Sequence, residues 1–312
     1  MNNVKFFFYI AFLLLIKIDC KCQFTEENIS GMNSEFGSDV ETKLLIEDDE
    51  SMGLITYFSR NSKKVCTQFF SYDRSSSLSA YSKYLAWKKG KNVIMLTSAG
   101  FSQSLDYPSC AGICIDDGKI ISSSFDNTLD GLFFITPYVN SNGDIVTVNL
   151  EQDYGKMKID GKVVYSKLTP SRFIIEVQDV KATLFQSQLF YYNDTPFYSW
   201  PKKEENYAPR RFFIAAYKSG LRYDIIISIP YNAPLTSYVY KSYKFITSKG
   251  FSVHSFFNLD TGWYDFYRLY SDFGQNYYVS VKDRNGHHLS MKGERDNDIS
   301  RATNFMVFYY QD

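Results

Sequence analysis

The sequence predicts an α+β fold in which strands dominate and two helices stand out. Aromatic residues, which favour strands, make up 18% of the 312 residues. Short apolar segments are separated by turn signals such as Asp116-Asp117-Gly118. Two segments repeat apolar residues at helical spacing and end at a glycine. We therefore expect strand-dominated mixed sheets with two main helices.

The composition narrows the class of protein. Lys and Arg number 34, as do Asp and Glu, so the formal net charge is zero. A general nucleic-acid binder usually carries a basic face, so we expect no nucleic-acid partner. Hydrophobic residues at 45% and charged residues at 22% are typical of a globular protein.

The first 22 residues have the pattern of a secretory signal peptide. Lys5 precedes an apolar run over residues 6–16, which is too short to span a bilayer. Small residues then mark a cleavage site, with Gln23 as the expected new N-terminus. We expect a mature chain without a transmembrane segment, secreted or otherwise extracytoplasmic.

Cleavage there would leave Cys66, Cys110 and Cys114. An odd number of cysteines argues against a disulfide scaffold. One bridge is possible, most simply between Cys66 and either of the others. The spacing of Cys110 and Cys114 is not that of a zinc or redox pair.

The mature chain is expected to begin with a loose polar segment and then form one domain. Residues 23–51 are polar and acidic, which indicates a solvated extension. The single domain is expected over residues 52–312, with short strands within residues 52–70. Limited proteolysis is expected to remove residues 23–51 first.

The first helix is predicted to start at residues 75–77 and to end at Gly90. Leu78, Tyr81 and Leu85 would share its buried face. Further strands are then expected at residues 92–97, 112–115, 131–136, 144–150, 173–177 and 182–189.

The second helix is the strongest helical prediction. Residues 235–249 place Leu235, Val239 and Ile246 on one face, after Pro234 and before a glycine. A hairpin of residues 212–217 and 224–229 precedes it. Strands at residues 252–259, 276–282 and 304–311 follow it.

Motifs for common catalytic and cofactor sites are missing from the sequence. It has no glycine-rich nucleotide loop, zinc-protease motif, serine-hydrolase elbow or calcium loop. Of the three histidines, His287 and His288 are adjacent, so on a strand they would point to opposite faces. His254 lies mid-strand near Asp260 and is expected in the core, with a supporting place behind the site as the alternative. We expect no metal and no cofactor.

Polar residues at the end of an apolar strand give the first candidate site. Asn258 and Asp260 end the run Phe256-Phe257-Asn258-Leu259-Asp260, and alternation places both on one face. They could line a site, or Asp260 could cap a strand-end turn.

A double arginine gives the second candidate. Arg210 and Arg211 enter a buried strand, where an arginine needs an anionic partner, either a carboxylate or a ligand phosphate. Small polar residues also occur at residues 97–101, where one expected strand ends, and at residues 185–189, within another expected strand.

The order of these segments resembles the phosphodiester glycosidase family, whose members include phosphodiester α-N-acetylglucosaminidases. The matching segments are TSAGF, GICIDDGKI, LDGLFFITPYVNSNGDI, FQSQLF, RRFFIAAYKSG, a helix and NLDTG, within about residues 93–311. The resemblance implies the family fold, with its core at residues 93–312.

The resemblance also implies roles for individual residues. Asp260 and Arg211 match the family's acidic residue and arginine and would be catalytic. The implied substrate-binding residues are Asn258, Arg210, Gln186, Ser187, Ser98 and Gly100. Arg211 would hold a phosphate, and Asp260 would orient water or stabilise positive charge at the anomeric carbon.

Two other functions remain open. Thr261, Trp263 and Tyr264 depart from the glycine- and serine-containing family motif, which favours a non-catalytic glycan-binding protein on the same fold. An aromatic-rich structural protein is the third possibility. The first hypothesis is a secreted hydrolase with a carbohydrate or glycosyl-phosphate ligand.

Overall fold

The structure is a computed structural model. It describes residues 23–29, 38–60, 65–102, 109–126, 128–129, 131–135, 145–150, 157–159, 162–165, 170–179, 181–196, 207–260, 267–270, 276–277, 280–282, 288–290 and 304–311. The expected signal peptide, Thr261, Trp263, Tyr264 and His287 lie outside these ranges.

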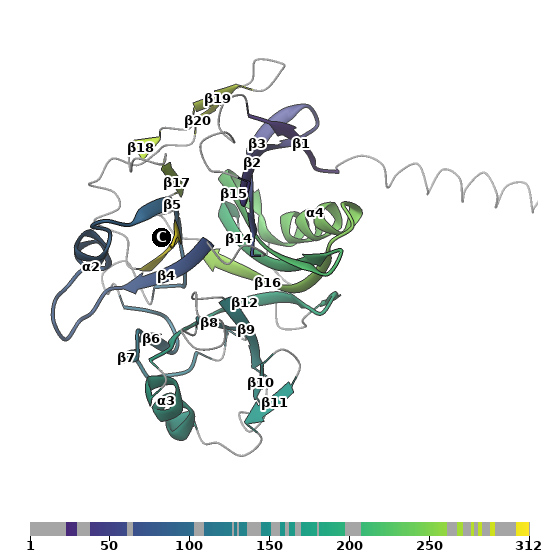
Figure 1. The fold of residues 1–312 in the computed structure, drawn as a ribbon. Coiled ribbons are helices and arrows are strands. Elements are labelled where there is room, and N and C mark those ends of the chain that lie inside the picture. Colours follow the sequence, from purple (N-terminus) through teal and green to yellow (C-terminus); the bar gives the residue numbers. More distant parts are fainter. Residues whose placement is uncertain are drawn as a thin grey trace, which may run out of the picture.

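The elements follow one another in a strand-rich order (Figure 1). The strands of the first half are β1 (Thr25–Asn28), β2 (Val40–Glu47), β3 (Glu50–Ser59), β4 (Val65–Ser71), β5 (Asn92–Ser98), β6 (Cys114–Asp116), β7 (Lys119–Ser122), β8 (Gly131–Ile135), β9 (Ile145–Leu150), β10 (Met157–Ile159) and β11 (Lys162–Tyr165). Those of the second half are β12 (Thr183–Tyr192), β13 (Thr195–Pro196), β14 (Tyr207–Lys218), β15 (Leu221–Pro234), β16 (Ser252–Asp260), β17 (Tyr267–Tyr270), β18 (Asn276–Tyr277), β19 (Ser280–Lys282), β20 (His288–Ser290) and β21 (Asn304–Tyr310). The helices are α2 (Ala80–Trp87), α3 (Pro170–Asp179) and α4 (Leu235–Ser248).

The described strands form a large sheet and a smaller one. The large sheet has 14 strands, with the central order β1-β2-β3-β15-β14-β16-β12-β8-β9-β10-β11. The smaller sheet has the order β18-β17-β5-β21-β4, and β19 pairs with β20. Strand dominance is confirmed, and an α+β description fits broadly.

The strand pairing differs from the mixed sheets that we expected. Every pairing among the described strands is antiparallel. Short turns such as those of the β2–β3 and β14–β15 hairpins can connect antiparallel strands only, because parallel neighbours need a long crossover.

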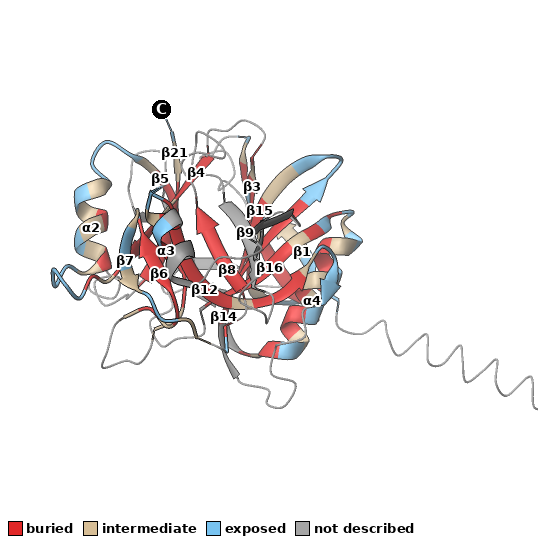
Figure 2. Cartoon of the chain, turned by 90° about the horizontal axis from the view of Figure 1, so that it is seen from below, coloured by how far each residue is buried: buried red, intermediate tan, exposed pale blue. Residues whose placement is uncertain are grey.

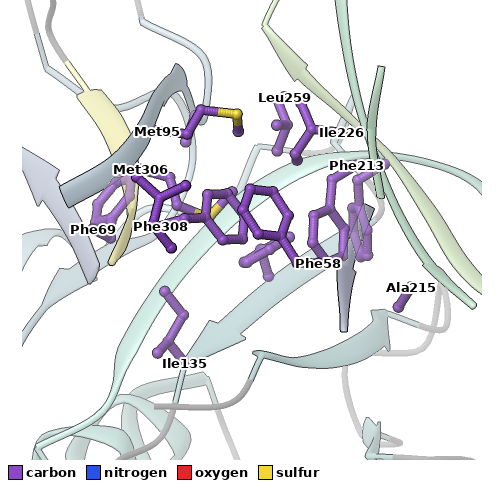
Figure 3. Close-up of a cluster of buried hydrophobic side chains, with 14 of the residues drawn as sticks. Phe58, Phe69, Met95, Ile135, Phe213, Ala215, Ile226, Leu259, Met306 and Phe308 are labelled. Carbon is purple, nitrogen blue, oxygen red and sulfur yellow. The ribbon is translucent and has the colours of Figure 1, made fainter. Parts of the chain in front are cut away.

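The main core lies between the two sheets. Phe58 of β3 stacks on Phe308 of β21, with ring centroids 4.1 Å apart, and Phe69 of β4 stacks on Phe185 of β12 at 4.7 Å. Figure 3 shows side chains from both sheets meeting in this cluster. The smaller sheet therefore packs on the larger one as part of the same hydrophobic core.

Helix α4 covers the other face of β14 and β16 (Figure 1). Leu235, Val239 and Ile246 are buried, as the helical spacing predicts, and they pack with Phe212 and Phe256. The outer faces of α2 and α4 are exposed while the strands beneath are buried (Figure 2). None of the helices in the described ranges has the length and apolarity needed to cross a membrane.

The first helix is shorter than expected. Ser79 is its N-cap and accepts a hydrogen bond from the Ser82 amide at 3.0 Å, so α2 starts at Ala80. Leu78 therefore precedes the helix and is 48% exposed, whereas Tyr84 is buried.

Two other expectations about local structure are wrong. Residues 173–177, expected as a strand, lie in α3, which begins at Pro170; proline suits a first helical turn. His254, expected in the core, is only half-buried, and its Nδ1 lies 3.0 Å from Asn193 Oδ1.

The segment 23–51 is not a loose extension where the structure describes it. It supplies β1 and β2 to the large sheet. Leu44 and Leu45 of β2 are buried in the core, and so is Phe24, which directly precedes β1. Its early removal by protease is therefore not expected.

Candidate functional site

Three of the segments with predicted site residues are neighbouring strands. β16 lies between β12 and β14 in the large sheet (Figure 1). Asn258 of β16 is opposite Gln188 of β12 on one side and Phe212 of β14 on the other. The fold thus brings together residues that lie up to 70 positions apart.

The pairing of β14 with β16 is irregular at the predicted catalytic residues. Phe212 pairs with Asn258, but Arg211, the residue before Phe212, pairs with Asp260. Leu259 is therefore an extra residue on β16. Such bulges bend a strand and often lie beside active sites. The backbones of Arg211 and Asp260 are therefore register partners at the end of β16.

Both arginines are buried and bonded to the neighbouring backbone. Arg211 is 3% exposed, and its Nη1 donates to the carbonyl oxygens of Arg210 at 2.9 Å and Ile229 at 3.3 Å. Arg210 is fully buried, and its Nε donates to the Ala233 carbonyl at 2.9 Å. These bonds fix the guanidinium groups against the end of β15.

Asn258 carries a buried acceptor that faces no donor within the described ranges. The residue is fully buried, and its Nδ2 donates to Gln188 Oε1 at 2.9 Å. Its side-chain oxygen Oδ1 accepts no hydrogen bond from any described group. Because an unsatisfied buried oxygen costs free energy, Oδ1 is a candidate ligand contact.

A pocket of about 650 Å³ opens beside this amide pair. Its lining consists of Phe101, Ser102, Ala111, Gly112, Ser124, Phe125, Asp126, Thr128, Leu129 and Gln188. Gln188 therefore connects the pocket directly to Asn258, which is two residues from Asp260. Two aromatic rings with three hydroxyl groups, one side-chain amide and one carboxylate are a lining suited to a small polar ligand.

Gln186, predicted to bind substrate, is not among the described lining residues but anchors two segments that line the pocket. Its Oε1 accepts from the amides of Ile113 and Asp126, both at 2.8 Å. Its Nε2 donates to the carbonyls of Asp126 at 3.1 Å and Leu129 at 2.7 Å. Gly112 lies so close that a Cβ there would be 2.3 Å from Gln186 Oε1.

None of the remaining predicted residues is among the described residues that line the pocket. Ser187 is buried and donates to the Asn258 carbonyl. Gly100 has a φ of +74° and lies against the Phe185 ring, just before the pocket residue Phe101. Ser98 is buried at the end of β5, opposite Phe305 in the smaller sheet.

Sequence reasoning missed the pocket segment 124–129. Asp126 Oδ1 accepts from the Thr128 amide at 2.8 Å and from its hydroxyl at 2.6 Å, which forms an aspartate turn. The Asp-Asn-Thr sequence indicated a turn, but no local signal placed this turn beside Gln186. Gln188 was detectable, since alternation places it on the face of Gln186.

Cys66, Cys110 and Cys114 are buried thiols, and no disulfide joins them in the described part of the chain. Cys110 Sγ donates to Asn304 Oδ1 at 3.0 Å. Burial, together with the hydrogen bond between Cys114 and Cys110, raises the pKa of the Cys114 thiol well above its ordinary value. A thiol in this state is a poor nucleophile, so Cys114 contributes packing next to the pocket.

Comparison with known proteins shows a distant fold relationship. No family model matches the chain, and no curated protein matches it. The chain is similar to the catalytic domain of zebrafish N-acetylglucosamine-1-phosphodiester α-N-acetylglucosaminidase, described as auto-inhibited by its pro-peptide. The identity is 13%, the TM-score is 0.51, and 94% of this chain and 89% of the zebrafish chain are covered.

A hypothetical protein from Synechocystis is 10% identical with a TM-score of 0.45, over 93% of this chain and 62% of the other. The zebrafish comparison supports a distant phosphodiester glycosidase-like fold.

Proposed function

We propose that this protein is a hydrolase that releases a sugar from a phosphodiester-linked glycoside. The observation that carries the proposal is the connection from the pocket to the predicted catalytic pair. Gln188 lines the pocket and binds Asn258, which is two residues from Asp260, and Asp260 is the register partner of Arg211. The fold resembles that of a phosphodiester glycosidase.

The pocket would hold the sugar. Phe101 and Phe125 offer ring faces to the apolar C–H surface of a sugar, and Ser102, Ser124 and Gln188 offer hydrogen-bonding groups. Asn258 Oδ1 would accept a hydrogen bond from the ligand. Without ligand this oxygen accepts no hydrogen bond from the described residues. The bond to the ligand would therefore remove the free-energy cost of an unsatisfied buried acceptor.

Asp260 and Arg211 would carry the chemistry. A carboxylate near the anomeric carbon stabilises the positive charge of an oxocarbenium-like transition state or orients the attacking water. Arg211 would favour the phosphate through its charge. A phosphate monoester leaves without much protonation, so the reaction does not require the second carboxylic acid of ordinary glycosidases.

We propose that the reaction takes place outside the cytoplasm. The support is the signal-like pattern of residues 1–22, which lie outside the described ranges. N-terminal sequencing of exported material tests this point. A mature chain beginning at Gln23 is expected, and a chain that keeps Met1 in a cytoplasmic fraction would contradict it.

The hydrolase proposal is tested by release of free sugar from synthetic methyl glycosyl phosphodiesters, with several sugars in parallel. Asp260→Asn should lower kcat at least ~100-fold, because it removes a charge while keeping the shape. Arg211→Lys should mainly raise KM, since lysine keeps the charge but loses the planar fork. Asp179→Asn and Arg74→Lys alter exposed residues and serve as controls. Unchanged turnover in Asp260→Asn would show that Asp260 is not a catalytic residue.

A non-catalytic glycan-binding protein is the second candidate function. It is favoured by the pocket lining, which contains no lysine or arginine among the described residues, and by the bonds of Arg211 to backbone carbonyls. Glycan binding by the wild type without turnover of any phosphodiester would support this function over hydrolysis.

A further inference from the structure

One carboxylate stands in a pocket wall that is otherwise uncharged. Of the described residues that line the pocket, only Asp126 has an ionisable side chain. The others are aromatic, aliphatic, hydroxyl or amide residues. No described lining residue could therefore neutralise a negative charge on a ligand.

The backbone of Asp126 is held at two points. Its amide donates to Gln186 Oε1 at 2.8 Å, and its carbonyl accepts from Gln186 Nε2 at 3.1 Å. Gln186 itself is 1% exposed and belongs to the long strand β12. The position of Asp126 is thus set by the sheet as well as by its own loop.

The carboxylate is also oriented. Oδ1 accepts both the amide and the hydroxyl of Thr128, at 2.8 Å and 2.6 Å. Within the described ranges no residue donates to Oδ2. One carboxylate oxygen therefore fixes the turn, and the other remains able to accept from a ligand hydroxyl.

We infer that Asp126 is a specificity-determining residue that selects uncharged or cationic sugars and excludes anionic sugars such as uronic acids. The inference rests on the proposed function in that it takes the pocket to be the sugar site. A sugar hydroxyl would donate to Oδ2 in a charge-assisted hydrogen bond. A sugar carboxylate would instead meet a like charge, which binding sites use to reject wrong partners.

The test uses simple methyl glycosides, which have no phosphate. Methyl α-glucoside and methyl α-galactoside are each compared with their uronic-acid counterpart, so each pair differs only at C6. Affinities are measured by NMR titration of the full chain. In the wild type, the neutral member of at least one pair should bind at least about tenfold more tightly than its acid.

Asp126→Asn should reduce that preference at least about tenfold, mainly by improving binding of the acid. Asparagine keeps an oxygen that can accept from Thr128, so the turn is retained. Asp117→Asn is the matched control, because Asp117 is an exposed turn residue outside the pocket lining and has a φ of 50°, which asparagine tolerates. It should leave the preference unchanged.

Three results would overturn the inference: equal binding of neutral and anionic members, an unchanged preference in Asp126→Asn, or no binding of any probe. Its failure is distinguishable from failure of the hydrolase proposal, because the probes report binding without turnover. Selective binding with no hydrolysis of phosphodiesters would support the inference and contradict the hydrolase proposal.

Discussion

At the scale of single residues, Gln186 determines the shape of the pocket. Its amide bonds to two backbone amides and two carbonyls, which belong to Ile113, Asp126 and Leu129. Both sides of the loop that lines the pocket are therefore attached to one side chain. A change in this amide should alter the pocket without touching the ligand.

Gln186→Glu tests this role. Glutamate has the same shape, but its carboxylate would face the carbonyls of Asp126 and Leu129 without a donor, so the free energy of unfolding should fall by at least about 2 kcal/mol. Urea unfolding measures the loss, and hydrogen exchange should show faster exchange at Ile113 and Asp126. Gln178→Glu on α3 is the control and should stay within about 1 kcal/mol of the wild type. Wild-type stability in Gln186→Glu would show that the four bonds contribute little.

Part of this site could be predicted from the sequence. Polar residues at the ends of apolar strands predict Asn258, Asp260 and the arginines as site residues. The structure pairs Arg211 with Asp260 in register, and the roles of these residues stay predictions. Asp126 could not be found in this way. Its place in the pocket depends on a bond to Gln186, which is 60 positions away, and turn residues show no periodicity that would reveal such a partner.

At the scale of elements, one carboxylate of β1 connects this strand to β2, β3 and the end of α4. Glu26 accepts hydrogen bonds from Lys43 at 3.0 Å, from the Tyr57 hydroxyl at 2.6 Å, and from Lys249 after α4. Burial alone would raise the pKa of Glu26, but the hydrogen bonds from Lys249, Tyr57 and Lys43 outweigh it and lower the pKa below its ordinary value.

Glu26→Gln should lower stability by roughly 1–3 kcal/mol at neutral pH. Since the folded-state pKa is lowered, this stabilisation is fully present above the unfolded pKa of about 4.3 and is lost as the pH falls below it. The deficit of the variant should therefore shrink from pH 7 to pH 3.5, as measured by urea unfolding. Glu50→Gln, at an exposed position, is the control. A deficit that does not change with pH would contradict the assigned cause.

The elements also differ in how well the sequence predicts them. Helix α4 was predictable because its apolar residues repeat regularly and a proline and a glycine mark its ends. β1 and β2 lie in a segment rich in acidic residues. β2 is buried where it pairs with β3, and β1 joins the sheet through β2; composition reveals neither pairing. In α3, a short apolar run fitted either a strand or a helix.

At the scale of the whole molecule, the two sheets share one core. Phe308 of β21 is fully buried and stacks on Phe58 of β3 at 4.1 Å. β21 lies between β5 and β4 in the smaller sheet, and its residues Phe305, Met306, Val307 and Phe308 are fully buried. We therefore expect the sheets to unfold together.

Phe308→Ala should lower the free energy of unfolding by about 3–5 kcal/mol, because it removes a buried ring shared by both sheets. Calorimetry should still show a single transition at a lower Tm. Tyr240→Ala, which alters a ring that is 53% exposed, should change stability by no more than about 0.5 kcal/mol. Two separate transitions in the wild type would indicate independent units instead of one domain.

The position of the oxygen that enters from water tests the proposed reaction most directly. Asp260 is proposed to act at the anomeric carbon, so hydrolysis of a methyl glycosyl phosphodiester in ¹⁸O-water should place the label on C1 of the released sugar. The methyl phosphate should carry none, and both products should form at least ~100-fold more slowly with Asp260→Asn. Label in the phosphate, release of a sugar 1-phosphate with methanol, or no turnover of any sugar tested would contradict the proposed function.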